Sequence, residues 1–113
     1  RRGYNNEKIT LLDETVKKVN KTFLLITDNS KALGIAGIMG GQHSGISADT
    51  ENIVLESACF NHKTIMGRSR MLNLHTESGL RFERGVDPLI QKHAIERATQ
   101  LINEYSDGQN GPI

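Results

Sequence analysis

The sequence predicts an α+β domain in which mixed or antiparallel sheet layers are followed by two helices. Up to about residue 60, apolar residues form short runs of strand length separated by polar turns. Beyond that point they recur at helical spacing. Strand and helix patterns do not alternate along the chain, which argues against a doubly wound parallel sheet. With 113 residues, the chain is long enough for a single domain with its own core.

Two strand regions are expected near the start of the chain. Residues 8–19 carry apolar side chains on both sides of Asp13–Thr15, a pattern that predicts a hairpin with its turn at these three residues. Residues 23–28 form a short apolar run that ends in the sequence DNSK. Asp, Asn and Ser bond their own backbone in turns, so a strand followed by a turn is expected.

Two further strands are expected before residue 61. Residues 32–39 are interpreted as one apolar strand thinned by Gly34 and Gly37, which are typical of a bulge or of close approach by another backbone. Residues 52–60, NIVLESACF, begin with β-branched residues and are apolar on both faces apart from Glu56 and its neighbour. This composition predicts a central strand.

The second half of the chain predicts two helices. Asn61 is suited to cap a helix over residues 62–72. The second helix has the clearer signature, with Asp87 as its N-cap, Pro88 at the first helical position and Gly108 beyond its end.

Composition limits the classes of function. The formal net charge of +1, with both signs mixed along the chain, gives no strong attraction to nucleic acid, so any RNA contact must be local. A single cysteine cannot form an internal disulfide, which fits a reducing cytoplasm. No apolar stretch is long enough to span a membrane. The chain starts without methionine inside a strand-like segment, so we expect a piece of a longer protein.

Glycines are concentrated in LGIAGIMGGQHSG, residues 33–45, which holds five of the eleven in the chain. A phosphate-binding P-loop needs Lys and Ser/Thr after its last glycine, where this chain has Gln42 and His43. The spacing also differs from the dinucleotide fingerprint G-x-G-x-x-G. Two interpretations stay open: a structural turn with a bulged strand, or a pocket wall made of bare backbone.

Glu56 is unusual because a carboxylate within an apolar strand is costly unless it has partners. It could form an ion pair with a core arginine such as Arg81 or Arg84. Alternatively, it could point into a ligand pocket. The sequence alone does not separate these two interpretations.

The segment between the two predicted helices, residues 74–87, is dense in polar side chains. It could be solvated surface. If extended, it would place Arg81 and Glu83 on one side and Phe82 on the other, so that an ion-pair network could brace the backbone. The four histidines have no metal-ligand spacing, so no metal site is expected, and no G-x-S-x-G motif exposes a serine nucleophile.

Three stretches of the chain are distinctive: LGIAGIMGGQHSGISADTENIVLESACF, GRSRMLNLHTES and RFERGVDP. Together they resemble the β subunit of bacterial phenylalanyl-tRNA synthetase, and the likeness extends from about residue 9 to residue 105. The resemblance implies that residues 1–113 are one truncated domain, the larger part of the editing domain that hydrolyses tyrosine wrongly joined to tRNA(Phe). It implies an α2β2 parent ligase that uses ATP and magnesium in its α subunit. The fragment itself would carry only the hydrolytic site and no cofactor.

The resemblance also implies roles for individual residues. Gly40 would line the amino-acid pocket with its backbone, Glu56 would recognise the tyrosine hydroxyl, and Thr76 would lie beside the scissile ester. Ser78 replaces an alanine common in the family and adds a hydroxyl where the aromatic ring packs. His75 is the candidate general base, and backbone amides near Gly40 and in the 75–78 loop are candidate oxyanion partners.

Energetics explain why such a domain is needed. A synthetic pocket shaped for phenylalanine cannot strongly reject a side chain that only adds a hydroxyl, so a second site has to remove the error. Two other functions stay open. One is a non-catalytic RNA-binding or interdomain scaffold of the same subunit, and the other is a freestanding aminoacyl-tRNA deacylase.

Overall fold

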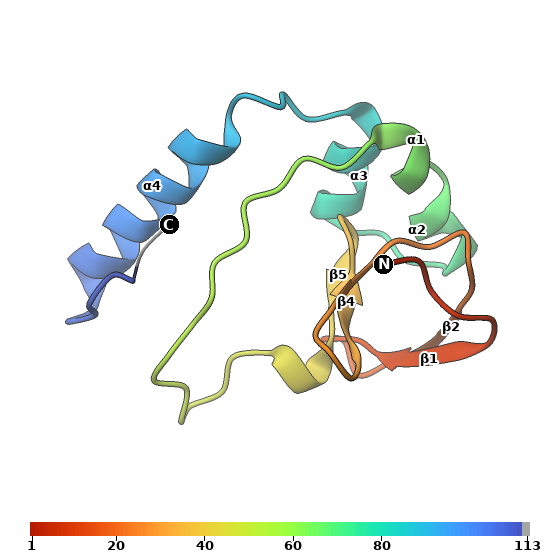
Figure 1. Ribbon diagram of the computed structural model, residues 1–113, viewed down its shortest axis with the longest axis horizontal. Helices are drawn as coiled ribbons and strands as arrows, with labels where there is room; N and C mark the ends of the chain where they lie inside the picture. The colour runs from red at the N-terminus through yellow and green to blue at the C-terminus, as the bar shows by residue number, and fades with distance from the viewer. Residues whose placement is uncertain (112–113) are drawn as a thin grey trace. The chain divides into compact units, whose positions relative to one another are not determined.

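The computed structural model describes residues 1–111, which divide into two compact units (Figure 1). The first unit comprises residues 1–51 and 60–86, and the second comprises residues 52–59 and the chain from residue 87 onward. Antiparallel strands come first along the chain and helices follow, which confirms the predicted α+β class.

The predicted hairpin is confirmed. Strands β1 (Glu7–Thr10) and β2 (Val16–Val19) pair antiparallel. In the turn between them, the Asp13 carboxylate accepts hydrogen bonds from both the backbone N–H and the hydroxyl of Thr15, at 3.0 and 2.7 Å. The local side-chain bonds expected from the sequence therefore close this turn.

A second antiparallel sheet has the order β3 (Leu25–Thr27), β4 (Ala32–Ile35) and β5 (Met39–Gly40). The turn after β3 is closed by Asp28, whose carboxylate accepts hydrogen bonds from the backbone N–H groups of Lys31 and Ser30, both at 2.7 Å. These bonds hold the pKa of the Asp28 carboxyl below its ordinary value. The strand and turn predicted over residues 23–28 are thus confirmed.

The prediction of one strand over residues 32–39 is wrong, because a tight turn at residues 36–38 separates β4 from β5. Gly37 has φ +68° in this turn, a conformation that L side chains rarely adopt. A Cβ at this position would also lie 3.0 Å from Cγ of Phe82. Gly37 therefore allows both the reversal of the chain and the close approach of the Phe82 ring.

The hydrophobic core of the first unit joins the hairpin, the sheet and the segment that holds the short helices. Phe82 packs against its edge, with its ring centroid 5.1 Å from that of Phe60. The buried core residues are Ile9, Leu11, Val19, Phe23, Leu25, Ile35, Ile38, Ile65 and Leu74.

The prediction of a central strand over residues 52–60 is also wrong. This segment has no strand partner among residues 1–111, and Val54 is 98% exposed. The Ser57 hydroxyl donates a hydrogen bond to the carbonyl of Gln91 at 2.9 Å within the second unit. β-branched composition favours a strand only where a neighbouring strand supplies ladder bonds, and here none does.

The first predicted helix is confirmed at its start, where the Asn61 side chain accepts a backbone N–H bond at 3.1 Å. Instead of one helix over residues 62–72, the chain forms two short helices, α1 (His62–Ile65) and α2 (Arg68–Met71). Gly67 breaks the helix between them with φ +75°.

A helix that the sequence analysis did not expect, α3 (Glu77–Arg84), occupies the polar segment. The extended arrangement considered for Arg81 and Glu83 is therefore wrong, because residues two apart on a helix face different directions. Glu83 accepts a backbone bond from Gly67, while Arg81 forms an exposed ion pair with Glu77 at 3.5 Å.

The last helix, α4 (Gln91–Tyr105), begins later than predicted. Asp87 is not its N-cap, because its carboxylate accepts the N–H of Leu89 in a turn that also contains Pro88 and precedes the helix. The helix ends before Gly108, as predicted. Among residues 1–111, no helix is long and apolar enough to cross a membrane.

Two glycines with positive φ, Gly37 and Gly67, give a stability prediction in which the Gly67 substitution is the control. Gly67→Ala should lower the free energy of unfolding by about 1–2 kcal/mol, because it strains a left-handed backbone in open space. Gly37→Ala should lower it further, because its Cβ also meets the Phe82 ring. Urea unfolding of both variants measures the difference. Equal losses in the free energy of unfolding would show that contact with the Phe82 ring adds no further destabilisation.

Candidate functional site

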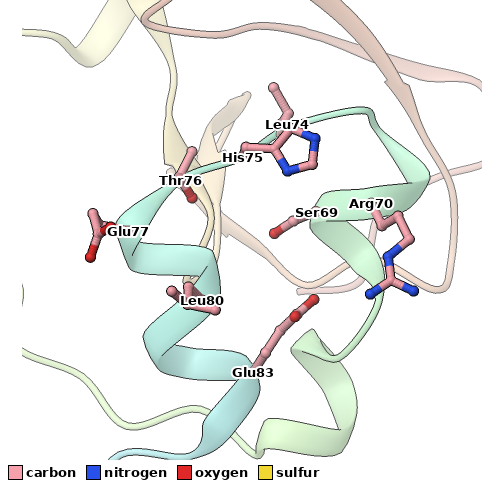
Figure 2. Close-up of a pocket in the computed structure, with 8 residues that line it drawn as sticks. All are labelled: Ser69, Arg70, Leu74, His75, Thr76, Glu77, Leu80 and Glu83. Atoms are coloured by element: carbon pink, nitrogen blue, oxygen red, sulfur yellow. The ribbon is translucent and has the colours of Figure 1, made fainter.

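The first unit contains a cavity of about 390 Å³ between α2, the α2–α3 loop and α3 (Figure 2). Its walls combine hydroxyl, charged and apolar groups, so it can contact both the polar and the apolar part of a small molecule. The lining residues are Ser69, Arg70, Leu74, His75, Thr76, Glu77, Leu80 and Glu83.

Thr76 lies at the N-terminus of α3, where its hydroxyl makes two hydrogen bonds. The oxygen accepts the backbone N–H of Gly79 at 2.9 Å, the usual bond of an N-cap. The same hydroxyl donates its proton to the carbonyl of Ile38 at 2.9 Å. Because its only proton is already donated, Thr76 can act toward a molecule in the cavity only as an acceptor.

Ser78 makes a parallel contact, since its hydroxyl donates to the carbonyl of Gly37 at 3.0 Å. Two carbonyls of the β4–β5 turn thus accept hydrogen bonds from two hydroxyls at the start of α3. We call this set of contacts between Gly37, Ile38, Thr76 and Ser78 the turn clamp. Ser78 does not line the cavity.

Gly40 lies in β5 and is exposed. Its carbonyl accepts the N–H of Leu12 at 3.0 Å, and a Cβ at this position would lie 3.2 Å from the Leu12 side chain. Its backbone therefore ties the sheet to the loop that follows β1, and Gly40 is not among the residues that line the cavity.

His75 is exposed and lines the cavity next to Thr76 (Figure 2). Within residues 1–111, no hydrogen bond or ion pair engages its imidazole. The ring nitrogens are therefore available to hydrogen-bond a molecule in the cavity.

Glu56 belongs to the second unit, where it is exposed, so the costly burial expected from its apolar neighbours does not occur. Within the described part of that unit, its carboxylate has no hydrogen bond or ion pair. Arg81, one of the two arginines considered as its partner from the sequence, is paired with Glu77 in the first unit. The structure brings His75 and Thr76 together on one cavity, and places Gly40 and Ser78 elsewhere in the same unit.

Ser69 and Glu83 line the cavity but were not among the site residues predicted from the sequence. Ser69 is only 8% exposed, and its Oγ has no hydrogen-bond partner among the described residues. Glu83 is half-buried and accepts the N–H of Gly67 at 2.8 Å. Helical spacing is the signal that could have found Glu83, because Thr76, Leu80 and Glu83 are four and three residues apart and so share a face of α3.

Residues 1–107 match the model of the B3/4 domain family, and the chain belongs to this family. Its relatives include β subunits of phenylalanine–tRNA ligase, which confirms the resemblance found in the sequence. Identity is 52% with that of Francisella tularensis and 50% with that of Yersinia pestis, each over 96% of this chain. It is 50% with that of Nitrosococcus oceani over the whole chain. The chain spans 14% of the length of each of these relatives.

The Thr76 contacts predict a stability difference between two substitutions. Thr76→Val removes both hydrogen bonds of the hydroxyl and should lower the free energy of unfolding by about 1–3 kcal/mol. Thr76→Ser keeps the hydroxyl and should remain within about 1 kcal/mol of the unsubstituted protein. Urea unfolding distinguishes them. A Thr76→Val protein as stable as Thr76→Ser would mean that neither bond contributes to the fold.

Proposed function

We propose that this chain is the proofreading part of a phenylalanine–tRNA ligase β subunit and hydrolyses tyrosine wrongly esterified to tRNA(Phe). Family membership and the names of the relatives support the ligase context. The observation that carries the hydrolytic role is the placement of Thr76 and His75 on one cavity, with the Thr76 proton already committed to Ile38.

The Thr76 oxygen can hold the attacking water in a useful orientation. Because Thr76 can only accept, the water must donate a hydrogen to it, and the water's lone pair is then free to face the ester carbonyl. The free hydroxyl of the terminal ribose is the second group proposed to hold this water. Such positioning lowers the entropic cost of the attack.

The hydrolysis then proceeds by addition and elimination. The water oxygen forms a bond to the carbonyl carbon and its proton passes to His75, the proposed general base. Collapse of the tetrahedral intermediate breaks the bond between that carbon and the ribose oxygen. The ribose oxygen takes back a proton, which leaves tyrosine and intact tRNA.

Backbone amides at the start of α3 are proposed to stabilise the oxyanion. Among the described residues, the N–H groups of Glu77 and Ser78 have no carbonyl acceptor, as expected for the first turn of a helix. Gly40 is proposed to contribute backbone to the amino-acid pocket, as the resemblance implies. In this proposal the Ser78 hydroxyl stays bonded to Gly37 and leaves the ring of the substrate unhindered.

Glu56 is proposed to select tyrosine over phenylalanine. Glu56 is exposed and its carboxylate has no partner among the described residues of its own unit, so it can accept a hydrogen bond from a phenol hydroxyl, which a phenyl ring cannot donate. The preference of the editing site is then opposite to that of a synthetic pocket shaped for phenylalanine.

The ligase context implies partners outside this chain. We infer an α subunit in an α2β2 assembly, the 3′ end of tRNA(Phe) as the bound RNA, and the cytoplasm as the compartment. ATP and magnesium would serve the synthetic reaction of the assembled ligase. The proposed hydrolysis needs only water and the residues named above.

The test uses the assembled ligase with Tyr-tRNA(Phe) and Phe-tRNA(Phe) as separate substrates. Glu56→Ala should slow hydrolysis of Tyr-tRNA(Phe) by about 10- to 100-fold, because the phenol loses a charged acceptor. Release of labelled amino acid measures the rates.

Glu51→Ala is the matched control, since Glu51 is exposed and lies only five residues away. It should hydrolyse Tyr-tRNA(Phe) at the normal rate. Unchanged deacylation by Glu56→Ala would remove this residue from the mechanism. A ligase that hydrolyses neither substrate would favour the scaffold alternative.

A further inference from the structure

Glu83 holds a carboxylate in a defined position on the cavity wall. Its Oε1 accepts the backbone N–H of Gly67 at 2.8 Å, which ties the last turn of α3 to the break between α1 and α2. Figure 2 shows the side chain reaching from α3 toward Ser69 on α2. Since one bond engages Oε1, the second oxygen is available to a ligand.

No cation neutralises this carboxylate within residues 1–111, although Arg70 lines the same cavity. Glu77, the other acidic residue of the cavity, is paired with Arg81 and exposed. A half-buried carboxylate that lacks a cationic partner favours binding of a positively charged group.

Ser69 is a second polar residue of the cavity wall. Its Oγ is buried and has no hydrogen-bond partner among the described residues, although buried hydroxyls are normally bonded. This oxygen faces Gly79 of α3, where an added Cβ would meet it, so it is packed against the helix. The Glu83 carboxylate is therefore the group on this wall that offers a charged contact to a ligand.

We propose that the Glu83 carboxylate binds the α-ammonium group of the amino acid that is esterified to the tRNA. This inference rests on the proposed function and adds a subsite to it. Thr76 and Glu83 share a face of α3 and are separated by about 10 Å along the helix axis. Helical side chains lean toward the N-terminus, which brings the carboxylate closer to Thr76.

The chemistry of an aminoacyl ester matches this arrangement. Its ammonium group is on the carbon next to the ester carbonyl, so one molecule can meet Glu83 with the ammonium and the Thr76-bound water with the carbonyl. Leu74 and Leu80 give the cavity apolar wall for the carbon skeleton. The ammonium contact would therefore place the ester for attack.

The experiment compares two neutral-ended probes, L-tyrosinamide and 3-(4-hydroxyphenyl)propanamide, which differ only in the ammonium group. Equilibrium dialysis uses the assembled ligase with its synthetic site saturated by a phenylalanyl-adenylate analogue. The unsubstituted enzyme should bind L-tyrosinamide at least about tenfold more tightly. Glu83→Gln should bind both probes with equal affinity, because its amide oxygen can still accept the Gly67 N–H while the charge is lost.

Two further variants make the result specific. Glu77→Gln, on the same cavity, should keep the tenfold preference because that carboxylate is exposed and already paired. Glu83→Asp keeps the charge and should retain a preference, which tests the subsite even if Glu83→Gln does not fold. Equal binding of the two probes by the unsubstituted enzyme, or a preference that survives in Glu83→Gln, would overturn the proposal.

Failure of the proposed function gives a different result. If the ligase does not hydrolyse Tyr-tRNA(Phe) but still prefers L-tyrosinamide through Glu83, the ammonium subsite stands and the editing role falls. If the ligase hydrolyses Tyr-tRNA(Phe) while Glu83→Gln keeps the preference for L-tyrosinamide, the editing role is supported and the ammonium subsite is wrong.

Discussion

The turn clamp is the constraint on which the cavity depends. Carbonyls of Gly37 and Ile38 accept hydrogen bonds from Ser78 and Thr76, so a sheet formed early in the chain determines where α3 begins. The left-handed conformation of Gly37 makes the turn possible, and its missing side chain leaves room for Phe82 on α3. One face of α3 is thereby held toward α2, where the cavity lies.

The same clamp determines the chemistry available to Thr76. A hydroxyl whose proton is held by a backbone carbonyl cannot donate to a substrate, but it can accept from a water. The proposed hydrolysis uses only that acceptor, with proton transfer assigned to His75. Structural and catalytic roles of Thr76 are therefore compatible, because the stabilising bonds also orient its remaining lone pair.

Sequence reasoning predicted those elements that local bonds determine. Asp13 and Asn61 close a turn and cap a helix with their own side chains, and both were predicted. The strand predicted over residues 52–60 does not form, because a strand needs a distant partner strand, which local composition does not reveal.

Helix α3 was missed because its polar residues obscured the helical period that places Thr76 and Glu83 on one face. Thr76 and His75 entered the candidate site through the family resemblance. Ser69 could be recognised only through its burial, whereas the spacing of Thr76, Leu80 and Glu83 places Glu83 on the cavity face once α3 is known to be a helix.

The most direct test of the central claim is a crystal structure of the assembled ligase with a non-hydrolysable 3′-tyrosylamido-adenosine. We expect a water that donates to Thr76 Oγ1 within about 3.5 Å of the amide carbon, with the phenol hydroxyl bonded to Glu56. An analogue bound with its carbonyl away from Thr76, or its phenol away from Glu56, would contradict the proposed hydrolytic mechanism.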